Sequence, residues 1–257
     1  MDRLLIVKTL FFLYNFHMSF SLVTYNIHFN QAYAHLNEVF KGEKTDIVCL
    51  QEIETDENNL KRVENSTFKL ADYANSFVKF GKIFGVATFY NPEKFKFIKS
   101  TSIDLPRSLL EILLIILRGI NQPRIALKTD FIYKPLKKKI SIYNLHLTPF
   151  SSNGTRIKQI KEVLHNIDIF SKHSTIIAGD FNYPYGRKKF ESLIKNYHLK
   201  EATNNILFTL EQRFLKLFHY QAKLDYILYK NIELLETKKI HLRHSDHFPI
   251  ISKFKLE

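Results

Sequence analysis

The fold is decided by the stretch TIIAGDFN at residues 175–182. Its first four residues form a continuous apolar run with the length of a buried β-strand. Gly179 and Asp180 follow at the end of that run, and Asn182 comes two residues later. Gly179-Asp180 alone is also compatible with an ordinary turn. The stretch gains meaning because other parts of the chain repeat its arrangement, in which an apolar strand ends in a polar side chain.

Four further segments deliver Asn, Asp, Glu or His at the end of an apolar strand. They are TYNIH at 24–28, LQE at 50–52, NLHL at 144–147 and SDHFP at 245–249. Each is weak evidence alone, because Asn26 suits a turn, His146 suits a hydrogen-bonded core position and Asp246-His247 suits a surface loop. Together and in this order, they indicate one functional site.

A sixth segment, KLDYI at residues 223–227, embeds Asp225 inside a strand. A buried carboxylate costs free energy unless it is paired or bound to a metal ion. Asp225 therefore needs a partner, and an imidazole would serve.

The remaining patterns predict an α/β architecture. Residues 83–90 and 95–98 are expected to form a hairpin that turns at Asn91-Pro92. Apolar residues at helical spacing predict one helix that ends at Gly42 and another that begins near Gly154. Other strands are expected at 20–25, 46–50, 125–133, 140–147, 175–178, 224–229 and 248–254. Strands and helices alternate early in the chain, and antiparallel pairs of strands come later. This order favours two packed sheets with helices on the outside.

The chain has 257 residues, and no repeat, linker or change of composition marks a boundary. We therefore predict one domain at residues 19–257. Residues 1–18 are interpreted as an N-terminal extension, because Lys8 interrupts their apolar stretch and Met18 stands just before the first strand. The alternatives for this extension are a weak membrane anchor and a start assigned upstream of Met18.

The formal net charge is +13, with basic clusters at 137–139, 187–189 and 238–239. Such an excess favours nucleic acid, acidic lipid headgroups or phosphorylated metabolites as partners, although a general surplus of lysine that serves solubility explains it equally well. The single cysteine, Cys49, lies in an apolar run and fits a reducing compartment. A cytoplasmic location is expected, with membrane association as an option.

The ordered set of six segments resembles the endonuclease/exonuclease/phosphatase superfamily, which includes pancreatic-type deoxyribonucleases, abasic-site endonucleases, neutral sphingomyelinases and inositol-polyphosphate 5-phosphatases. The resemblance covers residues 19–256, and GDFN at 179–182 and SDH at 245–247 are its most specific pieces. It implies a catalytic domain folded as a four-layer α/β/β/α sandwich, with the active site at one edge where the two sheets meet.

The resemblance implies a metal site. Glu52 would be the principal ligand, with Asn26 beside it and Asp246 near the ion. Oxygen ligands of this kind suit Mg²⁺ or Mn²⁺, and neither a cysteine cluster nor HExxH spacing points to zinc.

It also implies catalytic roles. Asp180 would orient and deprotonate the attacking water, and Asn182 would position the water or the phosphate. His247, oriented by Asp225, would act as a general base or stabilise charge in the transition state. His146 would hydrogen-bond a non-bridging phosphate oxygen.

Arg156 follows His146 at the spacing usual in the superfamily and is predicted to bind substrate. Two other interpretations stay open for it: it fixes the loop after His146, or it lies on a solvated helix face.

These roles predict a monomeric, metal-dependent, nuclease-like phosphodiesterase with nucleic acid as the favoured substrate. The alternative is an enzyme that acts on a phospholipid or phosphoinositide at an anionic membrane surface. A catalytically silent binding module is a third class, but its sequence would be expected to have lost Glu52, Asp180 or His247, and all three are present.

The chain departs from the superfamily pattern in several places. Glu54 stands where DNA-cutting relatives often carry a basic residue, which weakens the case for duplex DNA. The chain has no tryptophan, which argues against an abasic-site endonuclease. Residues 85–90 contain no acid to support the first histidine, so the orientation of His146 is left open.

An apolar run, LLEILLIIL at 109–117, lies between Arg107 and Arg118. It is too short to span a bilayer. We expect a helix that is buried against the sheet or makes a dimer contact, and partial insertion into a membrane interface is the alternative.

Overall fold

The computed structural model describes residues 19–65, 67–79, 81–118, 124–149, 151–168, 170–214 and 218–256. The extension predicted for residues 1–18 lies outside these described residues. None of the helices within the described ranges is long and apolar enough to cross a membrane.

Two six-stranded sheets form the centre of the molecule. The first has the order β13-β14-β1-β2-β4-β3, with β1 (Ser19–Asn26), β2 (Ile47–Glu54), β3 (Lys69–Lys79), β4 (Lys82–Tyr90), β13 (Glu233–Lys239) and β14 (Ile250–Lys255). The second has the order β5-β6-β7-β8-β12-β9, with β5 (Phe95–Asp104), β6 (Ile125–Tyr133), β7 (Lys138–His146), β8 (Ser174–Asp180), β9 (Lys200–Glu201) and β12 (Asp225–Lys230). A separate antiparallel pair consists of β10 (Leu210–Phe214) and β11 (Phe218–Ala222).

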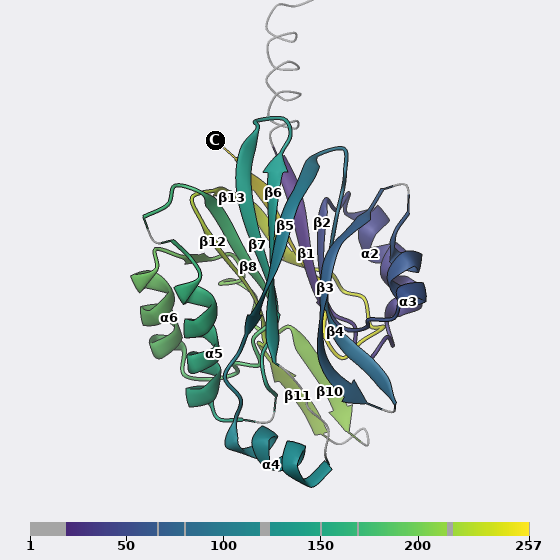
Figure 1. Cartoon of the computed structure of the whole chain (residues 1–257), viewed down its shortest axis with the longest axis vertical. Coiled ribbons are helices and arrows are strands. Elements are labelled where there is room, and N and C mark those ends of the chain that lie inside the picture. Colours follow the sequence, from purple (N-terminus) through teal and green to yellow (C-terminus); the bar gives the residue numbers. More distant parts are fainter. Residues whose placement is uncertain are drawn as a thin grey trace, which may run out of the picture.

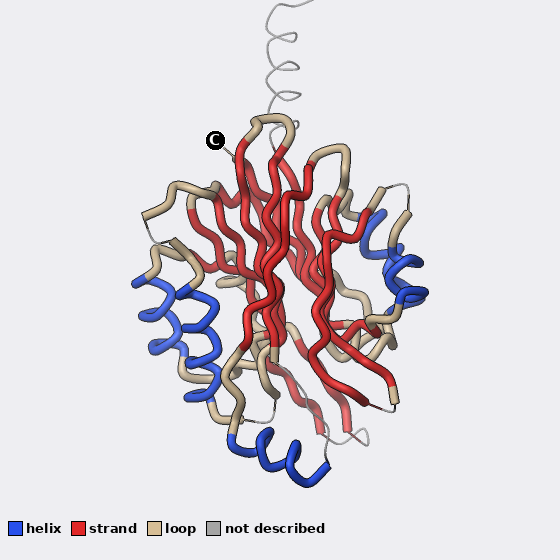
Figure 2. The backbone as a smooth tube through the Cα atoms, viewed as in Figure 1, coloured by secondary structure: helices blue, strands red, loops and turns tan. Residues whose placement is uncertain are grey.

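Helices cover the outer face of each sheet, as Figures 1 and 2 show. The 3-10 helix η1 (Tyr33–His35) leads into α2 (Leu36–Gly42), and α2 and α3 (Glu57–Val63) pack on the first sheet. On the second sheet lie α5 (Asn153–His165) and α6 (Arg187–Asn196). A third apolar cluster fills the space between the sheets. The predicted four-layer α/β/β/α sandwich is therefore confirmed.

The elements follow from local sequence. In α5, the side chain of Ser152 caps the first turn by accepting a hydrogen bond from the backbone N–H of Thr155. Ile157, Ile160 and Leu164 place one apolar stripe on the buried side of that helix. All residues of β8 are buried, as its continuous apolar run predicts.

The predicted hairpin of 83–90 and 95–98 is wrong. β4 pairs with β2 and β3 in the first sheet, whereas β5 pairs with β6 in the second, so residues 91–94 carry the chain from one sheet to the other. Asp46 anchors this crossing. Its carbonyl oxygen accepts a hydrogen bond from the N–H of Asn91 at 2.7 Å, and its Oδ2 lies 2.8 Å from Nζ of Lys94.

The run at 109–117 forms helix α4 (Leu109–Arg118). Its single acid, Glu111, is buried and paired with buried Arg124, whereas Ile112, Leu113, Ile116 and Leu117 are exposed. The expectation that the run packs against the sheet is therefore wrong for these four side chains. Ser108 and Glu111 explain the orientation, because each side chain accepts a hydrogen bond from the other residue's backbone N–H in a capping box.

Candidate active site

Three neighbouring strands of the second sheet place polar side chains in one row. β7 and β8 are parallel and pair His146 with Asp180, and β12 is antiparallel to β8 and pairs Asp225 with Asp180. Gly179 allows this close approach, since a Cβ there would lie 2.0 Å from the carbonyl oxygen of Leu145, and its φ is +146°. A side chain at residue 179 would push β8 away from β7 and separate Asp180 from His146.

In the first sheet, an irregularity of β2 brings Glu52 to the same site. The register of β2 against β4 shifts between Gln51 and Ile53, and Glu52 has a φ of +56°. This left-handed conformation is unfavourable for glutamate, and a bulge of this kind re-aims a side chain. The Glu52 carboxylate faces Asn26, with 3.3 Å between Oε1 and the Asn26 Nδ2.

Asn26 joins the carboxylates of the two sheets. Its Nδ2 donates to Glu52 and also to Oδ2 of Asp180 at 3.0 Å. The other Asp180 oxygen accepts a hydrogen bond from the backbone N–H of Asn182, and Nδ2 of Asn182 donates to the carbonyl oxygen of Leu147. Burial raises the pKa of both carboxyl groups, that of Asp180 to about 7. A divalent cation would relieve the cost of holding two buried carboxylates so close together.

A carboxylate–imidazole pair flanks Asp180. Nδ1 of His247 lies 2.7 Å from Oδ2 of Asp225, and Nε2 of His247 lies 3.7 Å from Oδ2 of Asp180. Burial opposes protonation of His247, but the carboxylates of Asp225, Asp180 and Asp246 outweigh it and raise the pKa of His247 to about 10. The imidazole is therefore held protonated, with Nε2 directed at Asp180.

His146 is the neutral imidazole of the site. Its Nε2 lies 3.7 Å from both Oε1 of Glu52 and Oδ2 of Asp180. Burial lowers the pKa of His146 well below its usual value, and the positive charges of Arg124 and His247 lower it further. Among the described residues, no group hydrogen-bonds its buried Nδ1. The ring instead packs against the edge of Phe77, with 6.0 Å between the ring centroids.

Arg156 lies beneath the loop that follows His146. It is buried and donates hydrogen bonds to the carbonyl oxygens of Thr148 and Pro149, at 3.0 and 2.7 Å. It therefore fixes this loop, one of the interpretations left open by the sequence. Its contact with substrate stays a prediction.

Asp246 lies at the rim of the site. Its Oδ1 is 2.7 Å from Nδ1 of His28, and its Oδ2 accepts a hydrogen bond from Gln212 at 2.7 Å. The preceding Ser245 donates its hydroxyl to the carbonyl oxygen of Asn26 at 2.8 Å, which ties this loop to the end of β1. The role of Asp246 as a metal ligand stays a prediction.

The structure thus joins most of the predicted site residues in one connected cluster: Asn26, Glu52, His146, Asp180, Asn182, Asp225 and His247. Asp180, Asp225 and His247 also offer ligand atoms within 4.8 Å of one another, so this part of the cluster could hold a metal ion. Buried acids, an imidazolium and a neutral imidazole at one edge of two sheets can bind a cation and an anionic group together.

Residues 23–247 match the sequence model of the Endonuclease/Exonuclease/phosphatase family. This chain belongs to that family. As a member of the endonuclease/exonuclease/phosphatase family, it is a hydrolase that acts on phosphoesters. No curated protein sequence matches the chain.

Solved structures share the fold of this family member. The human Nocturnin catalytic domain with bound sulfate is 17% identical, with a TM-score of 0.73 over 93% of this chain and 95% of that one. A mannosyl-6-phosphatase from Bacteroides thetaiotaomicron is 16% identical, with a TM-score of 0.68 over 91% and 99%. ANGEL2, a 2′,3′-cyclic phosphatase, is 16% identical, with a TM-score of 0.69 over 93% and 96%. Because the identities are this low, the similarity to these structures shows a common fold alone.

Sequence reasoning missed three polar residues of this phosphoesterase. Nε2 of buried Gln51 donates to Oδ1 of buried Asn144 at 2.8 Å, and Asn144 in turn donates to the carbonyl oxygens of Leu50 and Ala87. This network joins the two sheets directly behind Glu52 and His146. Its signal was present in the sequence, since an amide within an apolar strand must find a partner. The third residue is His28, and all three lie within the motifs at 24–28, 50–52 and 144–147 without a predicted role.

Proposed function

We propose that the chain is a divalent-metal-dependent phosphodiesterase that prefers nucleic acid. The observation that carries this proposal is the convergence of Glu52, Asp180, His146 and the Asp225–His247 pair on one end of the two sheets. Phosphoryl transfer requires a positioned water, neutralised phosphate oxygens and a stabilised leaving oxygen. Each of these needs has a matching group in the cluster.

The donor set fits a hard cation. Glu52 and Asn26 would hold it, with Asp246 nearby, because carboxylate and amide oxygens are the ligands that Mg²⁺ and Mn²⁺ prefer. Both buried carboxyl groups have a raised pKa in the absence of a cation, which indicates a site suited to positive charge. When bound, the cation would neutralise negative charge on the phosphate.

The side chains supply the remaining chemistry. Asp180 has a pKa of about 7, close to the value at which a carboxylate works well as a general base toward water. Asn182 holds the Asp180 carboxylate through its backbone N–H. The His247 imidazolium, fixed by Asp225, stabilises the negative charge that develops on the phosphate. Neutral His146 hydrogen-bonds a non-bridging oxygen through Nε2.

An aromatic surface beside His146 supports nucleic acid as the substrate. The rings of Phe29 and Phe77 are half-buried and lie 5.7 Å apart, with the Phe77 ring in edge contact with His146. Nζ of Lys79 lies 3.2 Å from the centre of the Phe29 ring. Aromatic rings and a cation at one surface are typical of sites that bind single-stranded nucleic acid.

In the folded protein, Glu54 argues less strongly against a DNA substrate. Its Oε2 lies 2.8 Å from Nζ of Lys82, and the side chain is 15% exposed. The carboxylate is therefore largely neutralised before any phosphate approaches.

The test is a substrate panel on metal-stripped protein, with and without added Mg²⁺. We expect hydrolysis of single-stranded oligonucleotides that EDTA abolishes and Mg²⁺ restores. Phe77→Ala should raise KM for oligonucleotides more than for bis(p-nitrophenyl) phosphate. Tyr73→Ala, which removes an exposed aromatic ring from the same strand, is the control. Hydrolysis of monoesters alone would overturn the nuclease assignment.

A second candidate substrate, a phospholipid or phosphoinositide, is favoured by α4. This helix connects β5 to β6, and Ala126 near the start of β6 pairs with Leu145 near the end of β7, so α4 lies at the active-site end of the sandwich. Figure 1 shows α4 at that end, beside the β10–β11 pair. Its exposed Ile and Leu side chains would enter a membrane interface.

Co-sedimentation with anionic vesicles tests this candidate. If lipid is the substrate, Ile116→Ser with Leu117→Ser should abolish vesicle binding and vesicle hydrolysis. Leu207→Ser, which removes an even more exposed leucine outside α4, should leave both unchanged. Equal binding by all three proteins would exclude the lipid candidate.

A further inference from the structure

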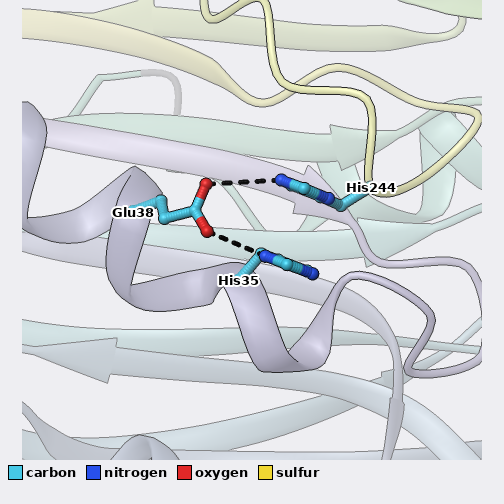
Figure 3. Close-up of side chains that lie close together, drawn as sticks. All are labelled: His35, Glu38 and His244. Atoms are coloured by element: carbon cyan, nitrogen blue, oxygen red, sulfur yellow. Dashed lines mark hydrogen bonds and ion pairs between the residues drawn. The ribbon is translucent and has the colours of Figure 1, made fainter.

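A second cluster of ligating side chains lies outside the catalytic cluster. It consists of His35 from η1, Glu38 from α2 and His244 from the loop before β14. Nδ1 of His35 lies 2.8 Å from Oε1 of Glu38, and Nε2 of His244 lies 3.3 Å from Oε2 of the same carboxylate. Figure 3 shows the two imidazoles side by side, each with one nitrogen directed at Glu38.

The geometry brings three possible ligands together. The two imidazole rings are parallel within 3° and their centroids are 3.5 Å apart. One ligand atom from each of the three residues lies within 4.8 Å of the others. Ligand atoms about 2.0–2.2 Å from a tetrahedral ion lie about 3.3 Å apart. The distances between the three atoms are therefore compatible with one ion, which the two stacked rings would bind after rotating so that their lone pairs converge.

The local sequence explains two of the three residues in this cluster. His35 and Glu38 are three residues apart, a spacing that places two side chains on one face of a helical segment. His244 comes from the other end of the chain, next to Ser245, whose hydroxyl binds the backbone of Asn26. An ion at this cluster would thus join α2 to the loop that presents Asp246 and His247.

The donor chemistry selects the class of ion. Two imidazole nitrogens and one carboxylate suit Zn²⁺, Cu²⁺ or Ni²⁺, whereas Mg²⁺ prefers oxygen ligands alone. The side chains are 40%, 52% and 30% exposed, which leaves room for water in the remaining coordination positions. An imidazole that binds a metal ion carries its proton on the opposite ring nitrogen, so the nitrogen that faces Glu38 would be the ligand.

We propose that His35, Glu38 and His244 form a transition-metal site, selective for Zn²⁺-class ions over Mg²⁺, that braces the loop carrying Asp246 and His247. This site is separate from the catalytic cluster and does not depend on the function proposed above.

The test is a titration of the full, metal-stripped chain with ZnCl₂ in excess Mg²⁺, followed by calorimetry and by thermal unfolding. We expect one equivalent of Zn²⁺ to bind and to raise Tm. Glu38→Gln and His244→Asn should each weaken Zn²⁺ binding at least about tenfold, because each removes one of three ligands. Both variants should lose the Zn²⁺-dependent rise in Tm.

Two controls locate the site. His219→Asn removes an imidazole that lies 2.6 Å from a single carboxylate, Glu211, and should leave Zn²⁺ affinity unchanged. Glu52→Gln alters the catalytic cluster and should also leave it unchanged. Tm without Zn²⁺ shows that each variant is folded. Zn²⁺ affinity that is the same in Glu38→Gln, His244→Asn and the parent, or that is lost in Glu52→Gln, would overturn the proposal.

Discussion

Asp225 shows how a single residue can point to chemistry. A carboxylate within an apolar strand needs a partner, and the structure supplies His247 at 2.7 Å. The consequence is electrostatic, because this carboxylate and its neighbours overcome the burial of the imidazole and keep it protonated. Removal of the negative charge should therefore act on catalysis more than on folding.

Asp225→Asn is expected to lower kcat by about 10²–10⁴-fold with a much smaller change in KM, since His247 loses the group that orients and charges it. Steady-state kinetics on a phosphodiester measures both constants. Asp130→Asn is the matched control. Asp130 on β6 also accepts a short hydrogen bond, which the hydroxyl of Ser141 on β7 donates at 2.6 Å. An unchanged kcat in Asp225→Asn would contradict the role given to the pair.

At the scale of elements, a hydrogen bond between side-chain amides joins the two sheets. Nε2 of Gln51 donates to Oδ1 of Asn144 at 2.8 Å. This hydrogen bond lies between β2 and β7, the two strands that carry Glu52 and His146. Both amides are fully buried, so each hydrogen bond in this network replaces one that water cannot supply.

Asn144→Leu should lower the free energy of unfolding by about 1–3 kcal/mol, because it removes the hydrogen bonds that Asn144 makes with Gln51 and with the carbonyl oxygens of Leu50 and Ala87. Urea unfolding measures the loss. The double variant Gln51→Leu with Asn144→Leu should cost less than the sum of the single changes, since both ends of the hydrogen bond are then removed. Strict additivity would show that the two amides do not act as a pair.

A second link joins β9 to its neighbours. Glu201 accepts hydrogen bonds from Arg187 on α6 and from Lys223, each at 2.7 Å. Burial opposes ionisation of Glu201, but these two cations outweigh it and hold its pKa below the usual 4.5. Because the folded pKa is lower than the unfolded one, the stabilisation is complete above pH 4.5 and is lost as the pH falls through the folded value.

Glu201→Gln should therefore reduce stability by about 1.5–3 kcal/mol at pH 7, and the difference from the parent should shrink below pH 4.5. Urea unfolding at pH 7 and at pH 3.5 tests this, with exposed Glu93→Gln as the control. A difference that is constant with pH would show that the Glu201 charge is not responsible.

The elements also show how far the sequence can predict this fold. Strands with continuous apolar runs, such as β2 and β8, are predictable because burial on both faces leaves that signature. β3 was missed because KLADYANSFVK mixes polar and apolar residues without a clear period. The crossing at Asn91-Pro92 was mistaken for a hairpin because turn residues do not reveal which sheet receives the next strand.

The site was partly predictable for the same reason. Strand ends deliver Asn26, Asp180 and His146, and a strand end can be seen in a sequence. The bulge that aims Glu52 and the pairing of Gln51 with Asn144 depend on contacts between strands far apart in the chain. The apolar run of α4 suggests that its Ile and Leu side chains are buried. Instead, the Glu111–Arg124 pair is buried, and Ile and Leu side chains of this helix are exposed.

At the scale of the whole molecule, the two ends of the chain complete one site. Asn26 on β1 and the loop at Ser245 contact each other directly, and both meet Asp180 from the middle of the chain. The sandwich is the means by which six separated segments become one cluster. We propose that Glu52, at the bulge of β2, makes this cluster a divalent-metal site for phosphoester hydrolysis.

The most direct measurement is the Mg²⁺ dependence of phosphodiester hydrolysis by Glu52→Gln, beside Glu54→Gln as the control from the same strand. The Glu54 carboxylate is already paired with Lys82. We predict that Glu52→Gln raises the Mg²⁺ concentration for half-maximal rate at least about tenfold or abolishes activity, whereas Glu54→Gln keeps the parent's Mg²⁺ profile. Full activity of Glu52→Gln at the parent's Mg²⁺ concentration, or hydrolysis that persists in EDTA, would contradict the account.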